Sequence, residues 1–229
     1  MADMAATLGS GAAGAVATRL RKAACASRRC GGPVMVIGGS LREASASVAV
    51  ARFIDGEIAR KGIASNLFTI EELNLPPFNP DHHRVDRSVA EDFVNAVRRC
   101  RAMIWCAPAY HQTISGSFKN VLDFIELTAD DKSVYLTGKV IGLVSTSGGV
   151  RAAVSCITSM QFVVHALRAF AIPYSVPIPH ANHLLDADGL IKDDDVLLKL
   201  RLVAQEVEGF VRHYSEPELR PTNQIKHLD

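Results

Sequence analysis

The stretch VMVIGGSLREASASVAVARF, residues 34–53, contains the change of pattern that decides the fold. Its first five residues are apolar or small, which is typical of a strand buried on both faces. Two glycines then permit a tight turn, and a polar loop leads into a segment in which Ala51, Ile54 and Ile58 recur at helical spacing. A buried strand, a polar loop and an amphipathic helix together predict the first βα unit of a parallel sheet.

The same alternation of strand-like and helix-like segments continues along the chain. Further strands are predicted at residues 64–70, 102–107, 140–145 and 172–178, and helices at residues 47–61, 88–100, 116–127, 151–170 and 194–214. Five such units in succession predict the α/β class, with one domain over residues 33–214 and helices on both faces of its parallel sheet. For a doubly wound sheet of five parallel strands in the flavodoxin-like order 2-1-3-4-5, the order reverses between the first and third strands.

The composition is that of a packed globular protein and argues against two kinds of partner. Of the 229 residues, 48% are hydrophobic, and 25 basic side chains are balanced by 24 acidic ones, so no net field attracts nucleic acid. No apolar run reaches the roughly 18–20 residues that a membrane span needs. We therefore expect a soluble, cytoplasmic protein. Five cysteines without a Cys-x-x-Cys pair are expected to be buried or idle thiols, namely Cys25, Cys30, Cys100, Cys106 and Cys156.

The two ends of the chain differ from the middle. Residues 1–32 are rich in Ala, Gly, Ser and Arg, and Asp3 is their only acid. They are interpreted as a disordered extension, with an organellar targeting segment as the alternative. Residues 215–229 contain two prolines and mixed charge, and are expected to form a solvated tail.

In an open α/β sheet, ligands bind beyond the carboxyl ends of the strands, where the strand order reverses. The loop after the first strand, GGSLREASAS at residues 38–47, offers serine hydroxyls, Arg42 and the free N–H groups of the next helix, which suit a phosphate group. It has neither a Walker G-x-x-x-x-G-K-[ST] motif nor a G-x-G-x-x-G motif, which favours a monophosphate. The alternative is a serine that caps the helix beside a surface arginine.

The loops after the third and fourth strands suit a flat ring. Pro108 is predicted to end the third strand, because proline lacks a ladder donor, and the turn at Tyr110 and His111 leaves backbone amides free. After the fourth strand, Gly148 and Gly149 permit a ligand to approach the backbone closely. Three such loops at neighbouring strand ends predict a site for a mononucleotide with a flat ring.

The segments GGSLREASAS, APAYHQTISGSFKNVLDFI and GKVIGLVSTSGG resemble the NADPH-dependent FMN reductase family of flavodoxin-like proteins. The resemblance covers residues 33–178 and implies an NAD(P)H:FMN oxidoreductase, with FMN and either NADPH or NADH as cofactors. It assigns the FMN phosphate to Ser40, Arg42, Ser45 and Ser47, and the edge of the isoalloxazine ring to Pro108, Ala109, Tyr110 and His111. The other side of the ring would be closed by Ser147, Gly148 and Gly149. No side chain is assigned a catalytic role, because the hydride chemistry belongs to the cofactor.

One departure from the family pattern leaves the electron acceptor open. The segment P-A-Y-H at residues 108–111 replaces the P-E-Y-N common in quinone and azo reductases of that family. The first interpretation is a reductase that supplies reduced FMN to a flavin-dependent monooxygenase. The alternatives are a quinone, azo or metal-ion reductase that retains its FMN, and a non-enzymatic FMN-binding redox carrier or sensor.

The resemblance also implies a homodimer or homotetramer. An apolar stripe over residues 160–170 is predicted to be core, and part of it could form the subunit interface. The remaining histidine motifs are left out of the site. His180 and His183 form an H-x-x-H pair, but a metal site needs a third ligand, so no metal centre is predicted. The polar segment at residues 82–87 is interpreted as a solvated loop, with an anchor for the 2′-phosphate of NADPH as the alternative.

Overall fold

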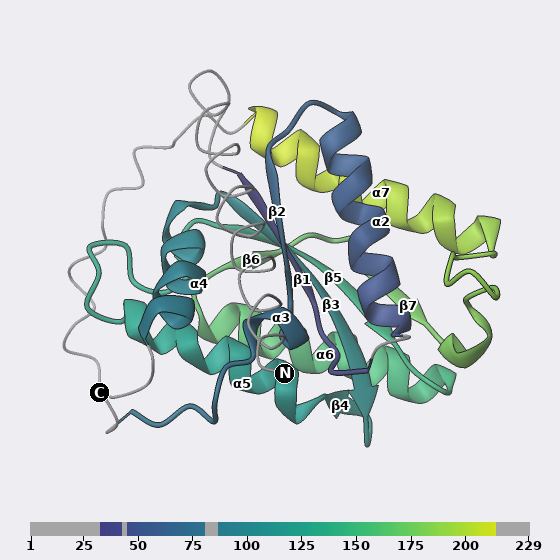
Figure 1. The fold of residues 1–229 in the computed structure, drawn as a ribbon. Coiled ribbons are helices and arrows are strands. Elements are labelled where there is room, and N and C mark those ends of the chain that lie inside the picture. The colour runs from purple at the N-terminus through teal and green to yellow at the C-terminus, as the bar shows by residue number, and fades with distance from the viewer. Residues whose placement is uncertain (1–32, 43–44, 81–86, 214–229) are drawn as a thin grey trace, which may run out of the picture.

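The computed structural model describes residues 33–42, 45–80 and 87–213, which build one sheet with helices on both faces (Figure 1). Five parallel strands follow the order β2-β1-β3-β5-β6. They are β1 (Val34–Gly38), β2 (Ser65–Thr69), β3 (Ala102–Tyr110), β5 (Val140–Thr146) and β6 (Phe170–Ala171). Since β5 and β6 are the fourth and fifth strands of this path, the predicted flavodoxin-like order is confirmed.

Two short strands make the sheet larger than predicted. β4 (Thr113–Ile114) pairs in antiparallel fashion with the end of β3. Of the predicted strand at residues 172–178, only Val176–Ile178 form a strand, β7. β6 lies before this range, and the two strands pair with different parts of β5. Pro173 lies between them and cannot donate to a ladder, because it has no amide hydrogen. The sheet therefore has seven strands rather than five.

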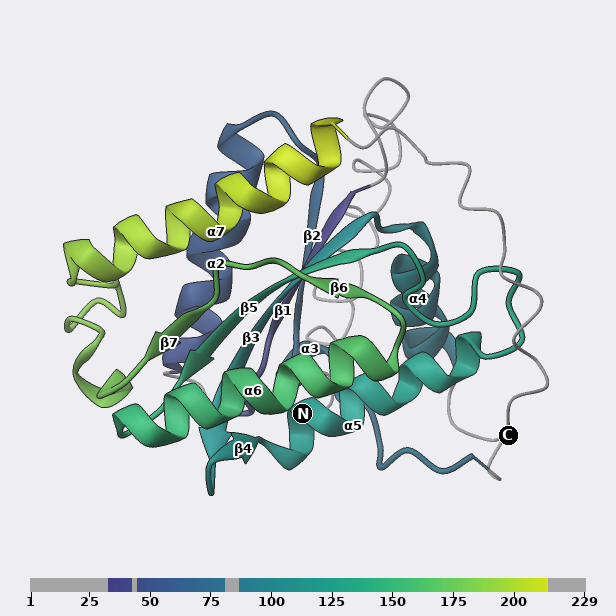
Figure 2. The ribbon, with the colours of Figure 1, turned by 180° about the vertical axis from the view of Figure 1, so that it is seen from behind.

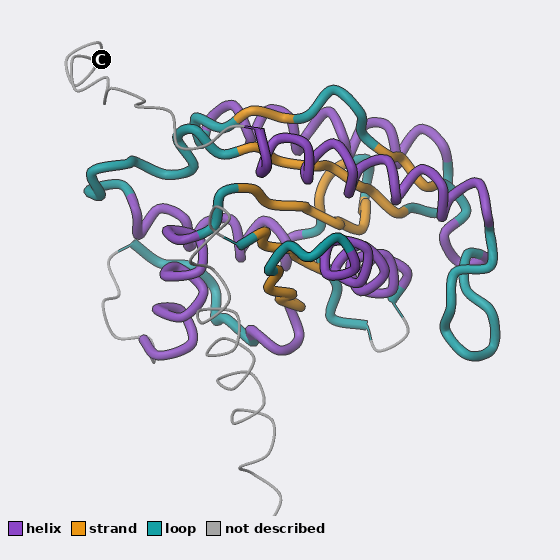
Figure 3. The backbone as a smooth tube through the Cα atoms, turned by 90° about the horizontal axis from the view of Figure 1, so that it is seen from above, coloured by secondary structure: helices purple, strands orange, loops and turns teal. Residues whose placement is uncertain are grey.

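Helices cover the sheet in two layers. One face carries α2 (Ala46–Arg60) and α7 (Asp194–His213), and the other carries α4 (Arg87–Arg99), α5 (Gly116–Asp123) and α6 (Val150–Ala166) (Figures 2 and 3). Among the residues described, no helix is long and apolar enough to cross a membrane.

Three short helical segments complete the chain path. α3 (Ile70–Leu73) follows β2 directly and was not predicted; Thr69 caps it by accepting a hydrogen bond from the N–H of Glu72, at 3.2 Å. η1 (Phe124–Thr128) continues α5, so that the two together span the predicted helix at residues 116–127. η2 (Ala181–His183) follows β7.

Alternate side chains of the central strands fill two apolar layers. Met35 and Trp105 are fully buried on the side of α4, α5 and α6, and Val34 and Val36 are fully buried on the side of α2 and α7. Because both faces of the sheet are covered, these strands are continuous apolar runs in the sequence rather than alternating ones.

The apolar stripe over residues 160–170 is only partly core, which corrects the prediction. Met160 is fully buried, but Phe162 and Phe170 are 73% and 62% exposed. The reason is that α6 ends at Ala166, so the two phenylalanines do not share one helix face, and Phe170 lies in the edge strand β6. Phe162 lies on the outer side of α6.

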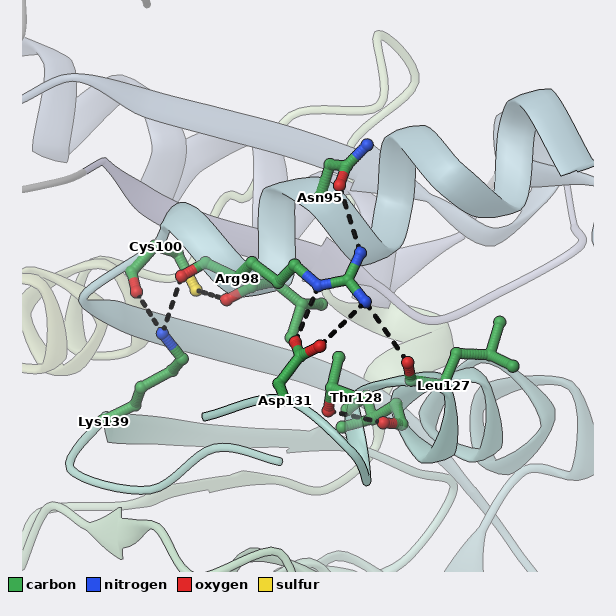
Figure 4. A network of polar contacts seen from close by, with 9 residues as sticks. Asn95, Arg98, Cys100, Leu127, Thr128, Asp131 and Lys139 are labelled. Atoms are coloured by element: carbon green, nitrogen blue, oxygen red, sulfur yellow. Dashed lines mark hydrogen bonds and ion pairs between the residues drawn. The ribbon is translucent and has the colours of Figure 1, made fainter. Parts of the chain in front are cut away.

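A polar network ties the end of α4 to η1 and to the segments that follow it (Figure 4). Arg98 donates to both carboxylate oxygens of Asp131, at 2.7 and 3.2 Å, and to the carbonyl oxygen of Leu127. Lys139 donates to the carbonyl oxygens of Arg98 and Cys100, which places a cation at the carboxyl end of α4, where a helix favours one. The network lies near the amino ends of β3 and β5, away from the edge where a ligand is expected, so its role is structural.

Three of the thiols are buried, as predicted: Cys100, Cys106 and Cys156. Burial raises the pKa of Cys100 to about 11 and that of Cys156 to about 12, and it also raises the pKa of Cys106. Because the thiolate is the reactive form, these thiols are inert at neutral pH. Cys25 and Cys30, the predicted extension and tail, and the polar segment over residues 82–86 lie outside the described residues.

Candidate cofactor site

A pocket of about 510 Å³ lies at the carboxyl edge of the sheet, over the ends of β1, β3 and β5. Its walls come from the loop after β1 with the start of α2, the end of β3, the loop after β5, and residues 181–189 after β7. The three predicted loops therefore meet around one cavity. Eight of the predicted residues line it, namely Ser40, Arg42, Ser45, Pro108, Ala109, Tyr110, Ser147 and Gly148.

A larger cavity, of about 970 Å³, lies near the amino ends of β5 and β6 and beside the last turns of α7. Its walls include the apolar side chains of Val140, Phe170 and Phe210. Two of its charged residues, Glu208 and Arg212, already pair with each other. Because ligands of open α/β sheets bind at the carboxyl ends of the strands, we place the cofactor site in the smaller pocket.

The turn after β1 accepts only glycine at position 39. The N–H of Gly39 donates to the carbonyl oxygen of Cys106 in β3, at 2.9 Å. A Cβ atom on Gly39 would collide with the ring of Phe118 and lie 2.9 Å from Cδ of Pro108. The backbone at Gly39 therefore passes close to the end of β3, where there is no room for a side chain. This close approach fixes the position of the loop that follows, in which Ser40 and Arg42 lie.

That loop presents hydroxyl groups and one cation. The hydroxyl of Ser40 accepts a hydrogen bond from the backbone N–H of Arg42, at 3.1 Å. Ser45 is the N-cap residue of α2, but its hydroxyl makes no capping bond and instead bonds the hydroxyl of Ser47, at 2.9 Å. Ser47 is buried and does not line the pocket, so it supports Ser45 rather than facing a ligand.

The amino end of α2 is suited to an anion. The first N–H groups of a helix have no partner within the helix, and the helix dipole adds a partial positive charge there. The first turn of α2 contains no acidic residue that would compete for these groups. Arg42 is exposed beside them, so its guanidinium can reach an anion bound at this end of the pocket.

β3 does not end at Pro108, contrary to the prediction. It continues to Tyr110, and Pro108 stays in register with Thr146 of β5. Pro108 faces the same side of β3 as Cys106, whose carbonyl oxygen bonds Gly39 just beyond the end of β1. On this side of β3, β1 has already ended at Gly38. The lack of an N–H on Pro108 therefore costs no hydrogen bond to β1.

Beyond Pro108 the chain forms a hairpin with β4. Ala109 and Tyr110 pair with β4 across the two-residue turn His111–Gln112. The φ angles of these two residues are 51° and 67°, both in the left-handed region that a type I′ turn requires. For residues other than glycine, this conformation costs about 1–2 kcal/mol each. His111 lies in this exposed turn rather than among the residues that line the pocket.

The loop after β5 is held in place through Ser147. Its N–H donates to the carbonyl oxygen of Ile178, at 3.0 Å, and its carbonyl oxygen accepts from the N–H of Ala181, at 2.8 Å. Its hydroxyl bonds the carbonyl oxygen and the N–H of Gly149, at 2.6 and 3.3 Å. Gly149 is the N-cap residue of α6 and does not line the pocket, whereas Gly148 does. A Cβ atom on Gly148 would meet no protein atom within 4 Å, so protein packing does not require glycine there.

The wall formed by residues 181–189 was missed in the sequence. Asp186 holds this segment together, because its carboxylate accepts hydrogen bonds from the N–H groups of Asp188 and Leu190, at 3.0 and 2.8 Å. Ala181 and Asn182 also line the pocket. The signal that could have revealed this wall is topological, since a segment that follows a strand of the same parallel sheet must emerge at the same edge. Within the described ranges, no group of three or more His, Cys, Asp and Glu side chains could hold a metal ion.

The pocket fits a phosphorylated flat ring such as FMN. One end combines serine hydroxyls, a guanidinium and a helix amino terminus, which are the donors that bind phosphate oxygens. Along the rest of the pocket, Ala109 and Gly148 are small, so a planar ring can approach the backbone from both sides. The volume lies within the range of roughly 300–1,000 Å³ that is usual for small-molecule sites.

The strand order and the position of the pocket define a flavodoxin-like α/β protein with a mononucleotide-type site. The family model of NADPH-dependent FMN reductases matches residues 33–183. Because this is more than half of the chain, the protein belongs to the NADPH-dependent FMN reductase family. It is therefore an oxidoreductase that uses FMN and a nicotinamide nucleotide, which confirms the enzyme class and the cofactors predicted from the sequence.

Individual relatives agree with this assignment. The chain is 24% identical to an FMN-dependent NADPH-azoreductase of Staphylococcus haemolyticus, over 78% of this chain and 95% of the relative. Among solved structures, an NADH:FMN oxidoreductase matches with a TM-score of 0.65 at 16% identity, over 82% of this chain and 92% of that one. The flavoenzyme NAD(P)H:acceptor oxidoreductase FerB of Paracoccus denitrificans matches with a TM-score of 0.63 at 18% identity, over 77% of this chain and 96% of that one. At these identities the two structures support the fold alone.

Proposed function

We propose that this enzyme binds FMN as an exchangeable substrate, reduces it with NADPH or NADH, and releases the reduced flavin to a separate monooxygenase. The observation that carries the proposal is the low positive charge around the phosphate end of the pocket. Arg42 is the only basic side chain among the described residues that line it. Arg42 is also exposed, so its attraction to a phosphate is screened by solvent and salt. A single screened cation favours moderate FMN affinity, which allows the flavin to leave after reduction.

The chain contributes binding and orientation in this proposal. When bound, FMN supplies the redox chemistry, because it accepts a hydride from the nicotinamide and passes the electrons on. Ser40, Arg42 and Ser45 hold the phosphate, and the hydroxyl of Ser47 positions that of Ser45. The ring lies between two walls, one formed by residues 108–110 and the other by Ser147 and Gly148. No side-chain acid or base is required for the hydride transfer.

A second candidate function is an azo or quinone reductase that retains its FMN through turnover. Two observations favour it. The Staphylococcus haemolyticus relative, of which the chain covers 95%, is an FMN-dependent NADPH-azoreductase. In addition, residues 181–189 enclose the pocket on one side and are tied to Ser147 by a 2.8 Å hydrogen bond, which would slow the release of a bound flavin.

Turnover should depend on added FMN if the flavin is exchanged. We expect the rate of NAD(P)H oxidation by the purified enzyme to rise and saturate as FMN is added, with no quinone or azo compound present. After anaerobic reduction of the FMN-loaded enzyme, ultrafiltration should recover reduced flavin in the filtrate. Full activity toward a quinone on the flavin that copurifies, with no response to extra FMN, would instead establish the second candidate.

We further propose that the enzyme is a homodimer that buries the outer face of α6. Val150, Val154 and Phe162 lie within roughly one third of the circumference of this helix and are 59%, 49% and 73% exposed, on the side away from the core. Exposed apolar side chains gathered on the outer side of a helix are typical of an interface. Replacement of Phe162 with aspartate should therefore yield a monomer in light scattering. The matched control is Leu198→Asp on α7, on the opposite side of the sheet, where Leu198 is 54% exposed; this variant should remain a dimer. A dimer that survives Phe162→Asp would exclude this interface.

A further inference from the structure

The turn His111–Gln112 combines backbone strain with exposure beside the pocket. Within the described ranges it is the only place where two adjacent residues other than glycine both have positive φ angles. Two-residue turns of this kind favour Asn-Gly, so this chain keeps two larger side chains at a cost in free energy. Strained residues persist where the surrounding structure enforces them, and they concentrate at functional sites.

The hairpin below the turn is anchored to the rest of the fold. Pro108 pairs with Thr146, the last residue of β5, so the end of β3 protrudes past β5 and pairs only with β4 (Figure 1). Ile114 of β4 is buried in the core, and the hydroxyl of Thr113 donates to that of Ser159 on α6, at 3.2 Å. The hairpin therefore cannot relieve the strain at its tip by moving away from the pocket.

The tip stands just outside the pocket wall. Tyr110, the residue before the turn, lines the pocket and is 49% exposed, while His111 and Gln112 are exposed and do not line it. Leu41 and Leu190 are neighbours in the sequence of pocket residues and are 61% and 65% exposed. Tyr110 therefore contributes exposed aromatic surface to the pocket wall, and the two polar side chains of the turn follow it directly in the chain.

We propose that the side chains of His111 and Gln112 bind the electron acceptor, a planar aromatic compound with carbonyl oxygens. This inference rests on the second candidate function, the reductase that retains its FMN, because it assumes that a flavin ring stays in the pocket while the acceptor binds. A second flat ring that stacks over the first would extend beyond Tyr110, so its edge would reach the hairpin tip. There the imidazole N–H of His111 and the amide N–H of Gln112 can donate to carbonyl oxygens. The proposal concerns recognition of the acceptor and adds no chemical step.

Two double variants test this role. H111G/Q112G removes both side chains and places glycine, which adopts positive φ angles without strain, at both turn positions, so its melting temperature should be at least that of the parent enzyme. H111A/Q112A removes the same side chains but keeps a strained turn, so it should be less stable than H111G/Q112G. Both variants should lose affinity for the naphthoquinone menadione by roughly 5- to 30-fold, the equivalent of one or two hydrogen bonds. This affinity is measured on oxidised enzyme with saturating FMN, from the change in flavin absorption.

Other measurements separate acceptor binding from a merely structural role. Neither variant should change the affinity for FMN, the rate at which NAD(P)H reduces bound FMN, or the rate of reoxidation by ferricyanide, which has no carbonyl group. Unchanged menadione affinity in both variants overturns the proposal, and so does a parallel loss of FMN affinity or ferricyanide rate. Because menadione binding is measured on oxidised enzyme without nicotinamide, its outcome does not depend on whether NAD(P)H reduces the flavin. Failure of the underlying candidate function would appear separately, as a parent enzyme whose bound FMN is not reduced by NAD(P)H or leaves the enzyme once it is reduced.

Discussion

Replacement of Arg42 with alanine should weaken FMN binding by about one to two decades while leaving riboflavin binding nearly unchanged. A charge-assisted hydrogen bond contributes roughly 1.5–3 kcal/mol, and each 1.4 kcal/mol corresponds to about tenfold in affinity. Only FMN carries the phosphate, and Arg42 is the only basic side chain among the described pocket residues. Titrations that follow flavin fluorescence would measure both affinities.

A matched control is available on the helix that follows. Arg52 of α2 is also exposed but does not line the pocket, so Arg52→Ala should leave both affinities unchanged. Added salt should weaken FMN binding to the parent enzyme more than to Arg42→Ala, because salt screens an exposed ion pair. Equal losses of FMN and riboflavin affinity in Arg42→Ala would contradict the phosphate role of this loop.

Replacement of Gly39 with alanine should abolish measurable FMN binding and destabilise the fold by about 1–3 kcal/mol. The added methyl group would overlap the ring of Phe118 and approach the carbonyl oxygen of Cys106, at 2.9 Å. Phe118 is fully buried and Cys106 O is a backbone atom, so neither can move aside easily. The turn must shift instead, and it would carry the phosphate loop with it. Urea unfolding and FMN titration measure the two effects.

Gly148→Ala provides the contrasting variant. A Cβ atom at this position meets no protein atom within 4 Å, so the stability of the apoprotein should stay close to that of the parent. Because Gly148 lines the pocket, the same methyl group should still lower FMN affinity. A Gly39→Ala protein that is as stable as the parent would show that the turn is more adaptable than its contacts indicate.

The parts of the fold that were predicted correctly are those set by local pattern. β1, β2 and the long helices follow from apolar runs and helical spacing, because each element buries its own apolar residues against the common core. β4 and the division into β6 and β7 could not be predicted in this way. β4 exists because β3 continues past Pro108, and that continuation depends on where the neighbouring strand β1 ends. The relative ends of two strands are set by tertiary packing, so they leave no periodic pattern in the sequence.

The candidate site shows the same division. Ser40, Arg42 and Ser45 could be found because glycines, hydroxyls and a cation follow a buried strand directly. His111 was assigned to the edge of the flavin ring through the family resemblance, whereas a tight turn carries it outside the pocket wall. Asn182 and Asp186 were missed because they follow β7, a three-residue strand hidden inside a longer apolar segment.

The buried position of Trp105 gives the protein a built-in optical reporter. Trp105 is the single tryptophan of the chain, it lies three residues before Pro108 on β3, and its ring packs edge-on against Phe118 at 6.2 Å. Its ring is fully buried and its indole N–H has no hydrogen-bond partner among the described residues, so its emission should be blue-shifted and homogeneous. A flavin in the pocket absorbs in the range of this emission and would lie well within the reach of resonance energy transfer. Ultraviolet excitation of the unlabelled enzyme should thus report, in real time, how much of it carries a flavin.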